Sequence, residues 1–161
     1  MKRTNKLTLL ALFVSLSAAG GMIKIPAVVG SVALDSLAAL LAASIIGGGF
    51  GAVTAMSGHL ISSTLAGFPL GPLHVLIAAE MGGAVWLFGV VFKKSPVIAA
   101  GSFFIINAFI APLPFIFIIS KAFYFSILPS LCIGAFLNLT IAHFAYPPLN
   151  RYFQEKVRRP S

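Results

Sequence analysis

The stretch "LHVLIAAEMGGAVWLFGVVF", residues 73–92, holds one carboxylate, Glu80, in an otherwise almost wholly apolar run. At 1.5 Å per residue, a helix of this length covers the roughly 30 Å hydrocarbon core of a bilayer. Similar apolar stretches lie before and after it, at residues 7–24, 32–48, 50–66, 96–119 and 123–146. The sequence therefore predicts an all-α integral membrane protein, folded as a compact bundle of six transmembrane helices.

The composition leads to the same class. The chain has 161 residues, of which 59% are hydrophobic and 9% charged, and its mean hydropathy is +1.04. A water-soluble core of this size could not hide so much apolar surface. The connections between the apolar stretches are short, so we expect one membrane domain over residues 1–161, with no room for a soluble catalytic or nucleotide-binding domain.

Basic residues indicate the orientation of the bundle. All of the 11 Lys and Arg residues except Lys24 and Lys121 fall on one side of the predicted helices. The positive-inside rule then places both termini in the cytoplasm. The net charge of +8 would reflect this topology and anionic lipid, and no basic stretch interleaved with aromatic residues points to nucleic acid. Residues 1–21 also fit a secretory signal peptide, but the apolar stretches that follow favour a retained first helix.

Polar side chains gather in the outward half of the predicted bundle. The connection "GFPLGP", residues 67–72, is expected to form a tight outer cap because proline and glycine fix turns. A carboxylate at the centre of a membrane helix costs on the order of 3 kcal/mol, so the polar groups near this cap should face the interior. We expect them to line a small-molecule cavity, with simple helix-to-helix bonding as the alternative. The candidate binding residues are Asp35, His59, Ser62, Ser63, Phe68, His74, Glu80 and Asn107.

Other polar or small residues receive local interpretations. Asn138 and His143 lie in the inner half of the sixth segment, where we expect them to pair locally or to line a subunit contact. The glycine-rich residues 45–52 lack the lysine of a phosphate-binding loop and should form a tight inner turn. Cys132 is the single cysteine, so it forms no internal disulfide, and no metal-ligand spacing surrounds it. We predict no metal site and no catalytic residue.

A face of small residues marks the first helix. Ala11, Ser15 and Ala19 recur at a spacing of four, which places them on one side of a helix and permits close approach of another. Packing within the chain is the alternative. Together with the six short helices, the polar outer half and the run "ALFVSLSAAGGMIKIP" (residues 11–26), this face resembles the substrate-binding S component of an energy-coupling factor (ECF) vitamin transporter. The likeness covers essentially the whole chain in size and topology.

The resemblance implies partners and a location. In that family, small residues of the first helix contact a long transmembrane coupling subunit, so Ala11, Ser15 and Ala19 would form this contact, with serine in place of one alanine. The coupling subunit also holds two ATPase subunits, which use ATP and Mg. The chain itself would then be no enzyme and would carry no cofactor. Its place would be the prokaryotic plasma membrane, where it binds a vitamin-type ligand from outside.

The substrate is suggested by two stretches. "VALDSLAALLAA" (residues 32–43) and "GHLISSTLAGFPLGPLHVLIAAEM" (residues 58–81) look similar to S components for alpha-ribazole, the benzimidazole riboside salvaged for cobalamin synthesis. Under this resemblance the carboxylates and Asn107 would bind ribose hydroxyls, a histidine would meet the ring nitrogen, and Phe68 would cover the base. Hydroxymethylpyrimidine, cobalamin or a biotin-like compound remain alternatives.

Three readings outside this family stay open. An autonomous ion-coupled carrier would use Asp35, Glu80 and the histidines as a proton relay. A metal permease is disfavoured because the histidines are isolated. "AMSGH", residues 55–59, is similar to the nucleophile motif of rhomboid proteases, with Ser57 as nucleophile and His143 as base, but the two lie at different predicted depths.

Overall fold

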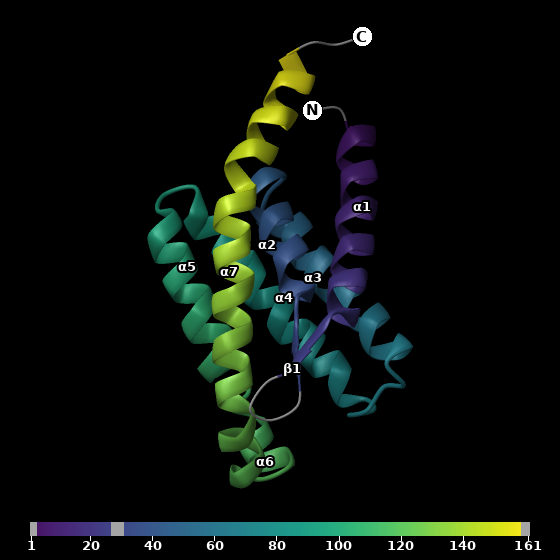
Figure 1. Cartoon of the computed structure of the whole chain (residues 1–161), viewed down its shortest axis with the longest axis vertical. Coiled ribbons are helices and arrows are strands. Elements are labelled where there is room, and N and C mark those ends of the chain that lie inside the picture. The colour runs from purple at the N-terminus through teal and green to yellow at the C-terminus, as the bar shows by residue number, and fades with distance from the viewer. Residues whose placement is uncertain (1–2, 27–30, 159–161) are drawn as a thin grey trace.

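In a computed structural model, which describes residues 3–26 and 31–158, the chain is a helical bundle with one small pair of strands (Figure 1). Its helices are α1 (Arg3–Met22), α2 (Asp35–Ile45), α3 (Gly48–Leu65), α4 (Leu73–Phe92), α5 (Pro96–Ile105), the π-helical η1 (Ile106–Ile110), α6 (Phe115–Ile118) and α7 (Lys121–Arg158). Strands β1 (Lys24–Pro26) and β2 (Ser31–Ala33) pair in antiparallel fashion between α1 and α2.

Four helical stretches are long and apolar enough to cross a membrane. They are Asn5–Met22, Leu73–Phe92, Pro96–Ile118 and Lys121–Glu155. The α2 helix is apolar but only 11 residues long. The α3 helix is continuous, but it contains serines and His59, which lower its hydropathy. All six predicted segments thus contain helix, but only four meet the length and apolarity that we expected of all six.

Several predicted boundaries are wrong. Residues 32–33 belong to β2 and not to a helix, because the apolar run that includes them suits a strand as well as a helix. In the fifth segment α5 passes directly into η1, and a turn that contains Pro112 and Pro114 separates η1 from α6. The sixth continues through Pro147 and Pro148 to Arg158, and α7 bends in its C-terminal part (Figure 1), as expected where proline removes helical hydrogen bonds.

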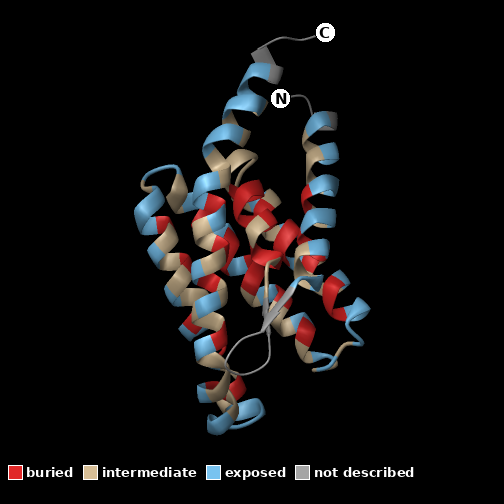
Figure 2. Cartoon of the chain, viewed as in Figure 1, coloured by how far each residue is buried: buried red, intermediate tan, exposed pale blue. Residues whose placement is uncertain are grey.

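The short α2 helix lies at the centre of the bundle. Its Ala39, Leu40 and Ala42 are fully buried, and α2 contacts α1, α3, α4 and α7. Small residues permit this close packing: a Cβ atom built on Gly51 of α3 would lie 2.5 Å from the Cβ of Ala43. Figure 2 shows the buried residues concentrated in this inner part, whereas the outer faces of α5 and α7 are largely exposed.

The two ends of the bundle differ. The α1 helix begins and the α7 helix ends at the same end of the molecule, and α6 lies at the opposite end (Figure 1). A turn joins α2 and α3, but it covers only residues 46–47 and not the predicted 45–52, because Gly48, Gly49 and Gly51 belong to α3. Gly47 in this turn has a φ of 117°, a conformation that favours glycine.

Candidate functional site

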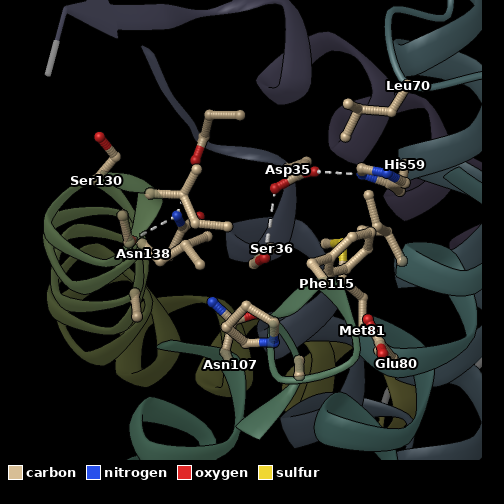
Figure 3. A pocket seen from close by; sticks show the side chains of 18 of the residues that line it. Asp35, Ser36, His59, Leu70, Glu80, Met81, Asn107, Phe115, Ser130 and Asn138 are labelled. Carbon is tan, nitrogen blue, oxygen red and sulfur yellow. Dashed lines mark hydrogen bonds and ion pairs between the residues drawn. The ribbon is translucent and has the colours of Figure 1, made fainter. Parts of the chain in front are cut away.

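A cavity of about 240 Å³ lies between α2, α4, η1 and α7, slightly below the usual 300–1,000 Å³ of small-molecule pockets. Four of the predicted binding residues line it: Asp35, His59, Glu80 and Asn107. Figure 3 shows these side chains around one space. Residues that sequence reasoning did not propose as ligand contacts complete the polar lining, namely Ser36, Ser130 and Asn138, and the apolar lining includes Leu70, Ile77, Met81, Phe115, Phe123 and Ile127.

Asp35 is held in place at the first turn of α2. It is 8% exposed, and its backbone carbonyl accepts a 2.7 Å hydrogen bond from the Ser17 hydroxyl of α1. Its carboxylate oxygens meet two partners, the Ser36 hydroxyl at 3.3 Å and Nδ1 of His59 at 3.2 Å (Figure 3). The positive end of the α2 dipole also favours a negative charge at this position.

Two histidines extend this contact towards the α3–α4 connection. Nε2 of His59 lies 3.1 Å from Nδ1 of His74, and the backbone N–H of Leu70 donates to Nε2 of His74 at 3.3 Å. Because Nε2 of His74 accepts, a neutral His74 carries its proton on Nδ1 and donates to His59. His59 then carries its own proton on Nδ1 and donates to Asp35. We call Leu70, His74, His59 and Asp35 the histidine chain.

The α3–α4 connection is tight, as the sequence predicts. Gly67, Phe68 and Gly71 all have left-handed φ values, of 85°, 53° and 53°. A positive φ is energetically unfavourable for a phenylalanine. The Phe68 N–H donates a 2.7 Å hydrogen bond to the Ser63 carbonyl. The Phe68 ring packs against His74 with 5.0 Å between ring centroids. Phe68 therefore covers the histidine chain and does not line the cavity.

The remaining predicted residues also lie outside the cavity lining. Ser62 and Ser63 are buried, but their hydroxyls donate to the carbonyls of His59 and Leu60 in their own helix, at 3.1 and 3.0 Å. His74 reaches the cavity only through His59. The structure thus separates the predicted set into four lining residues and four that lie behind or beside them.

Asn138 is a lining residue for which we expected local pairing or a subunit contact. It is 2% exposed, and its amide nitrogen donates to the carbonyls of Gly134, at 2.8 Å, and of Ala33, at 3.0 Å. Among the described residues, its Oδ1 is a buried acceptor without a hydrogen-bond partner. The bond to Ala33, next to α2, joins two elements far apart in the sequence, so local pairing accounts for only one of its contacts.

Glu80 and Asn107 face the cavity without protein partners. Neither side chain makes a hydrogen bond or ion pair within residues 3–26 and 31–158. Asn107 belongs to η1, and π-helical turns frequently occur at functional sites. The η1 segment is tied to α7 by the Tyr124 hydroxyl, which donates to the Phe109 carbonyl at 3.2 Å.

Residues outside the cavity bear on the hypotheses of a partner contact, a protease-like site and a metal site. Ala11, Ser15 and Ala19 are exposed, whereas Phe13 and Ser17 form the buried side of α1. In the described part of the chain, no hydrogen bond joins Ser57 to the exposed His143, and no group of three or more His, Cys, Asp or Glu side chains is placed to hold a metal ion. Cys132 is a free, half-buried thiol.

Comparison of the chain with protein-family models, with curated proteins and with solved structures finds no match.

Proposed function

We propose that this chain is a membrane-embedded S component that binds a vitamin-sized molecule for an ECF-type importer. The observation that carries this proposal is the position of the acidic residues. The chain contains only three carboxylates, and two of them, Asp35 and Glu80, line one small cavity in a largely apolar bundle. Because such groups are costly inside a membrane, placing both on one cavity favours a binding role.

The exposed surface supports a membrane setting. Four helical stretches have the length and apolarity to cross a bilayer, and large apolar side chains point outward, with Val97 81% and Phe117 89% exposed. Exposed apolar surface on this scale is typical of contact with lipid. With the positive-inside rule, we place the bundle in a prokaryotic plasma membrane with both termini in the cytoplasm.

The exposed face of α1 supports a partner protein. Ala11, Ser15 and Ala19 lie on the side of α1 that points away from the bundle, and small side chains let two helices approach closely in a membrane. A transmembrane coupling subunit would pack on this face, and its two ATPase subunits would hydrolyse ATP with Mg. The chain would act by binding its ligand and by changing orientation with the coupling subunit.

For the ligand we favour alpha-ribazole. Its ribose hydroxyls suit the acceptors Asp35 and Asn138, and the rings of Phe115 and Phe123 offer apolar surface to a flat base. Hydroxymethylpyrimidine or a biotin-like compound are smaller alternatives, whereas a cavity of about 240 Å³ is too small for the corrin ring of cobalamin. An autonomous ion-coupled carrier is a second candidate, favoured by the histidine chain as a proton path.

The test is ligand binding by the detergent-purified full chain, measured by calorimetry with alpha-ribazole, hydroxymethylpyrimidine, thiamine, riboflavin and biotin. Replacing the lining residue Asn107 by Ala should weaken binding about tenfold, because a hydrogen bond to the ligand is lost. Asn150→Ala, on α7 outside the cavity lining, is the matched control. Absence of binding across the panel would contradict the proposal. Uptake driven by a pH gradient into liposomes that contain only this chain would favour the carrier.

A further inference from the structure

We infer that the cavity takes a ligand that donates hydrogen bonds or carries positive charge, and that it rejects carboxylated and phosphorylated compounds. This inference rests on the proposed function, since it assumes that a small molecule occupies the cavity. It adds the chemical class of that molecule.

Acidic side chains supply the charged groups of the described cavity lining. Asp35 and Glu80 both line the cavity, and no Lys or Arg is among the lining residues that the structure describes. His59 is the histidine of the lining, and both of its ring nitrogens face protein partners, Asp35 at 3.2 Å and His74 at 3.1 Å.

The main protein donors around the cavity are already used. The Nδ1–H of His59 is directed at Asp35, and the Ser36 hydroxyl donates to the same carboxylate. Both N–H bonds of the Asn138 amide are directed at backbone carbonyls. These two carbonyl contacts also fix the orientation of the amide, because exchange of its nitrogen and oxygen would face Oδ1 with two other acceptors.

The capacity that remains is mostly for accepting hydrogen bonds. It consists of the Glu80 carboxylate, the remaining lone pairs of Asp35, and Oδ1 of Asn138, which is buried and unpaired within the described part of the chain. An unpaired buried acceptor is costly, and a ligand N–H or O–H would remove that cost. Asn107 is the exception, since its amide can donate as well as accept.

The apolar side chains of the cavity lining narrow the chemical class of the ligand further. Met81 and Phe115 lie near Glu80 (Figure 3), and Phe123 also lines the cavity. This soft and aromatic surface suits a flat heterocycle and a cationic nitrogen. A phosphate or carboxylate would instead bring a further negative charge against two carboxylates in a region of low dielectric. The class that fits is therefore a nucleoside-like or amino-substituted heterocycle in its unphosphorylated form.

The test uses pairs of compounds that differ in one anionic group. Calorimetry on the purified full chain would compare alpha-ribazole with its 5′-phosphate, hydroxymethylpyrimidine and thiamine with their monophosphates, and biotin amide with biotin. In any pair that binds, we expect the member without the anionic group to bind on the order of 100-fold more tightly. Equal or tighter binding of the anionic member would overturn this inference and leave the proposed function standing. Absence of binding in every pair would overturn both.

Two variants locate the source of the preference. Glu80→Gln keeps the shape of the side chain but removes its charge, so the preference for the uncharged member should fall about tenfold. Glu155→Gln removes the same charge from an exposed position on α7 and should leave the preference unchanged. An unchanged preference in Glu80→Gln, or an equal loss in Glu155→Gln, would show that charge within the cavity is not the cause. If Glu80→Gln does not fold, Asp35→Asn provides the same comparison.

Discussion

Replacement of His74 by Phe tests the histidine chain directly. Phenylalanine keeps an aromatic ring beside Phe68, which lies 5.0 Å from His74 between ring centroids, but it removes two hydrogen bonds. Nε2 of His59 loses a donor at 3.1 Å, and the Leu70 N–H loses an acceptor at 3.3 Å. A buried polar atom left unpaired costs about 1–3 kcal/mol. Because the Leu70 backbone is only partly buried and can turn to water, we expect the free energy of unfolding to fall by about 1–3 kcal/mol in total.

Two further substitutions separate the contributions of the two bonds. The amide of His74→Asn reaches the position of Nδ1 and can still donate to His59. The carbonyl oxygen of His74→Gln reaches the position of Nε2 and can still accept from Leu70. Each variant should therefore unfold at a temperature between those of the wild type and His74→Phe, with thermal unfolding followed by circular dichroism in detergent.

Nitrogen NMR provides a readout that does not depend on stability. The chain has three histidines, so selective ¹⁵N labelling gives three ring systems, and the exposed His143 serves as the reference. We expect His59 and His74 to carry their protons on Nδ1. Protonation of His59 at Nε2, or wild-type stability of His74→Phe, would refute the histidine chain.

The remaining predictions concern packing and partner binding. Gly51→Ala should lower the free energy of unfolding by about 1–3 kcal/mol and with it the unfolding temperature. The new Cβ would lie 2.5 Å from the Cβ and 2.8 Å from the Cα of Ala43, so the core would be overpacked. Gly83→Ala, with nothing within 4 Å of its new Cβ, should unfold no earlier than the wild type, and the opposite order would contradict the α2–α3 packing. Ser15→Leu should leave ligand affinity unchanged but prevent copurification with a coupling subunit; copurification at the wild-type level would exclude this face of α1 as the contact.

Hydropathy predicted the helical segments but not their ends. The apolar residues 32–34 predict the start of a helix, whereas residues 31–33 pair with β1 in the structure. Hydropathy alone does not distinguish a short buried strand from the start of a helix. The apolar stretch of the sixth segment predicts a helix that ends near residue 146, yet α7 continues through Pro147 and Pro148 to Arg158. A proline weakens a helix at its own position, but the residues beyond it can still form helical hydrogen bonds.

Counting residues along the predicted helices does not give the side of the helix on which a polar residue lies. Ser62 and His59 are close together on α3, yet only His59 lines the cavity, because a rise of 1.5 Å per residue gives height and not direction. The nearly uniform hydrophobicity around the fifth and sixth segments gives no direction for their side chains either. Asn138 belongs to the sixth segment, where its place in the inner half suggested local pairing or a subunit contact. Its bond to Ala33 depends on how α7 packs beside β2 and α2, which no local pattern encodes.

The direction of the histidine chain is determined at its two ends. A backbone N–H can only donate, so Leu70 requires His74 to accept at Nε2. An ionised carboxylate can only accept, so Asp35 requires His59 to donate from Nδ1. The two central nitrogens, 3.1 Å apart, then have one compatible arrangement, in which His74 donates to His59. The polarity therefore follows from the tight α3–α4 connection and from the position of Asp35 at the start of α2, and it leaves Asp35 as an acceptor facing the cavity.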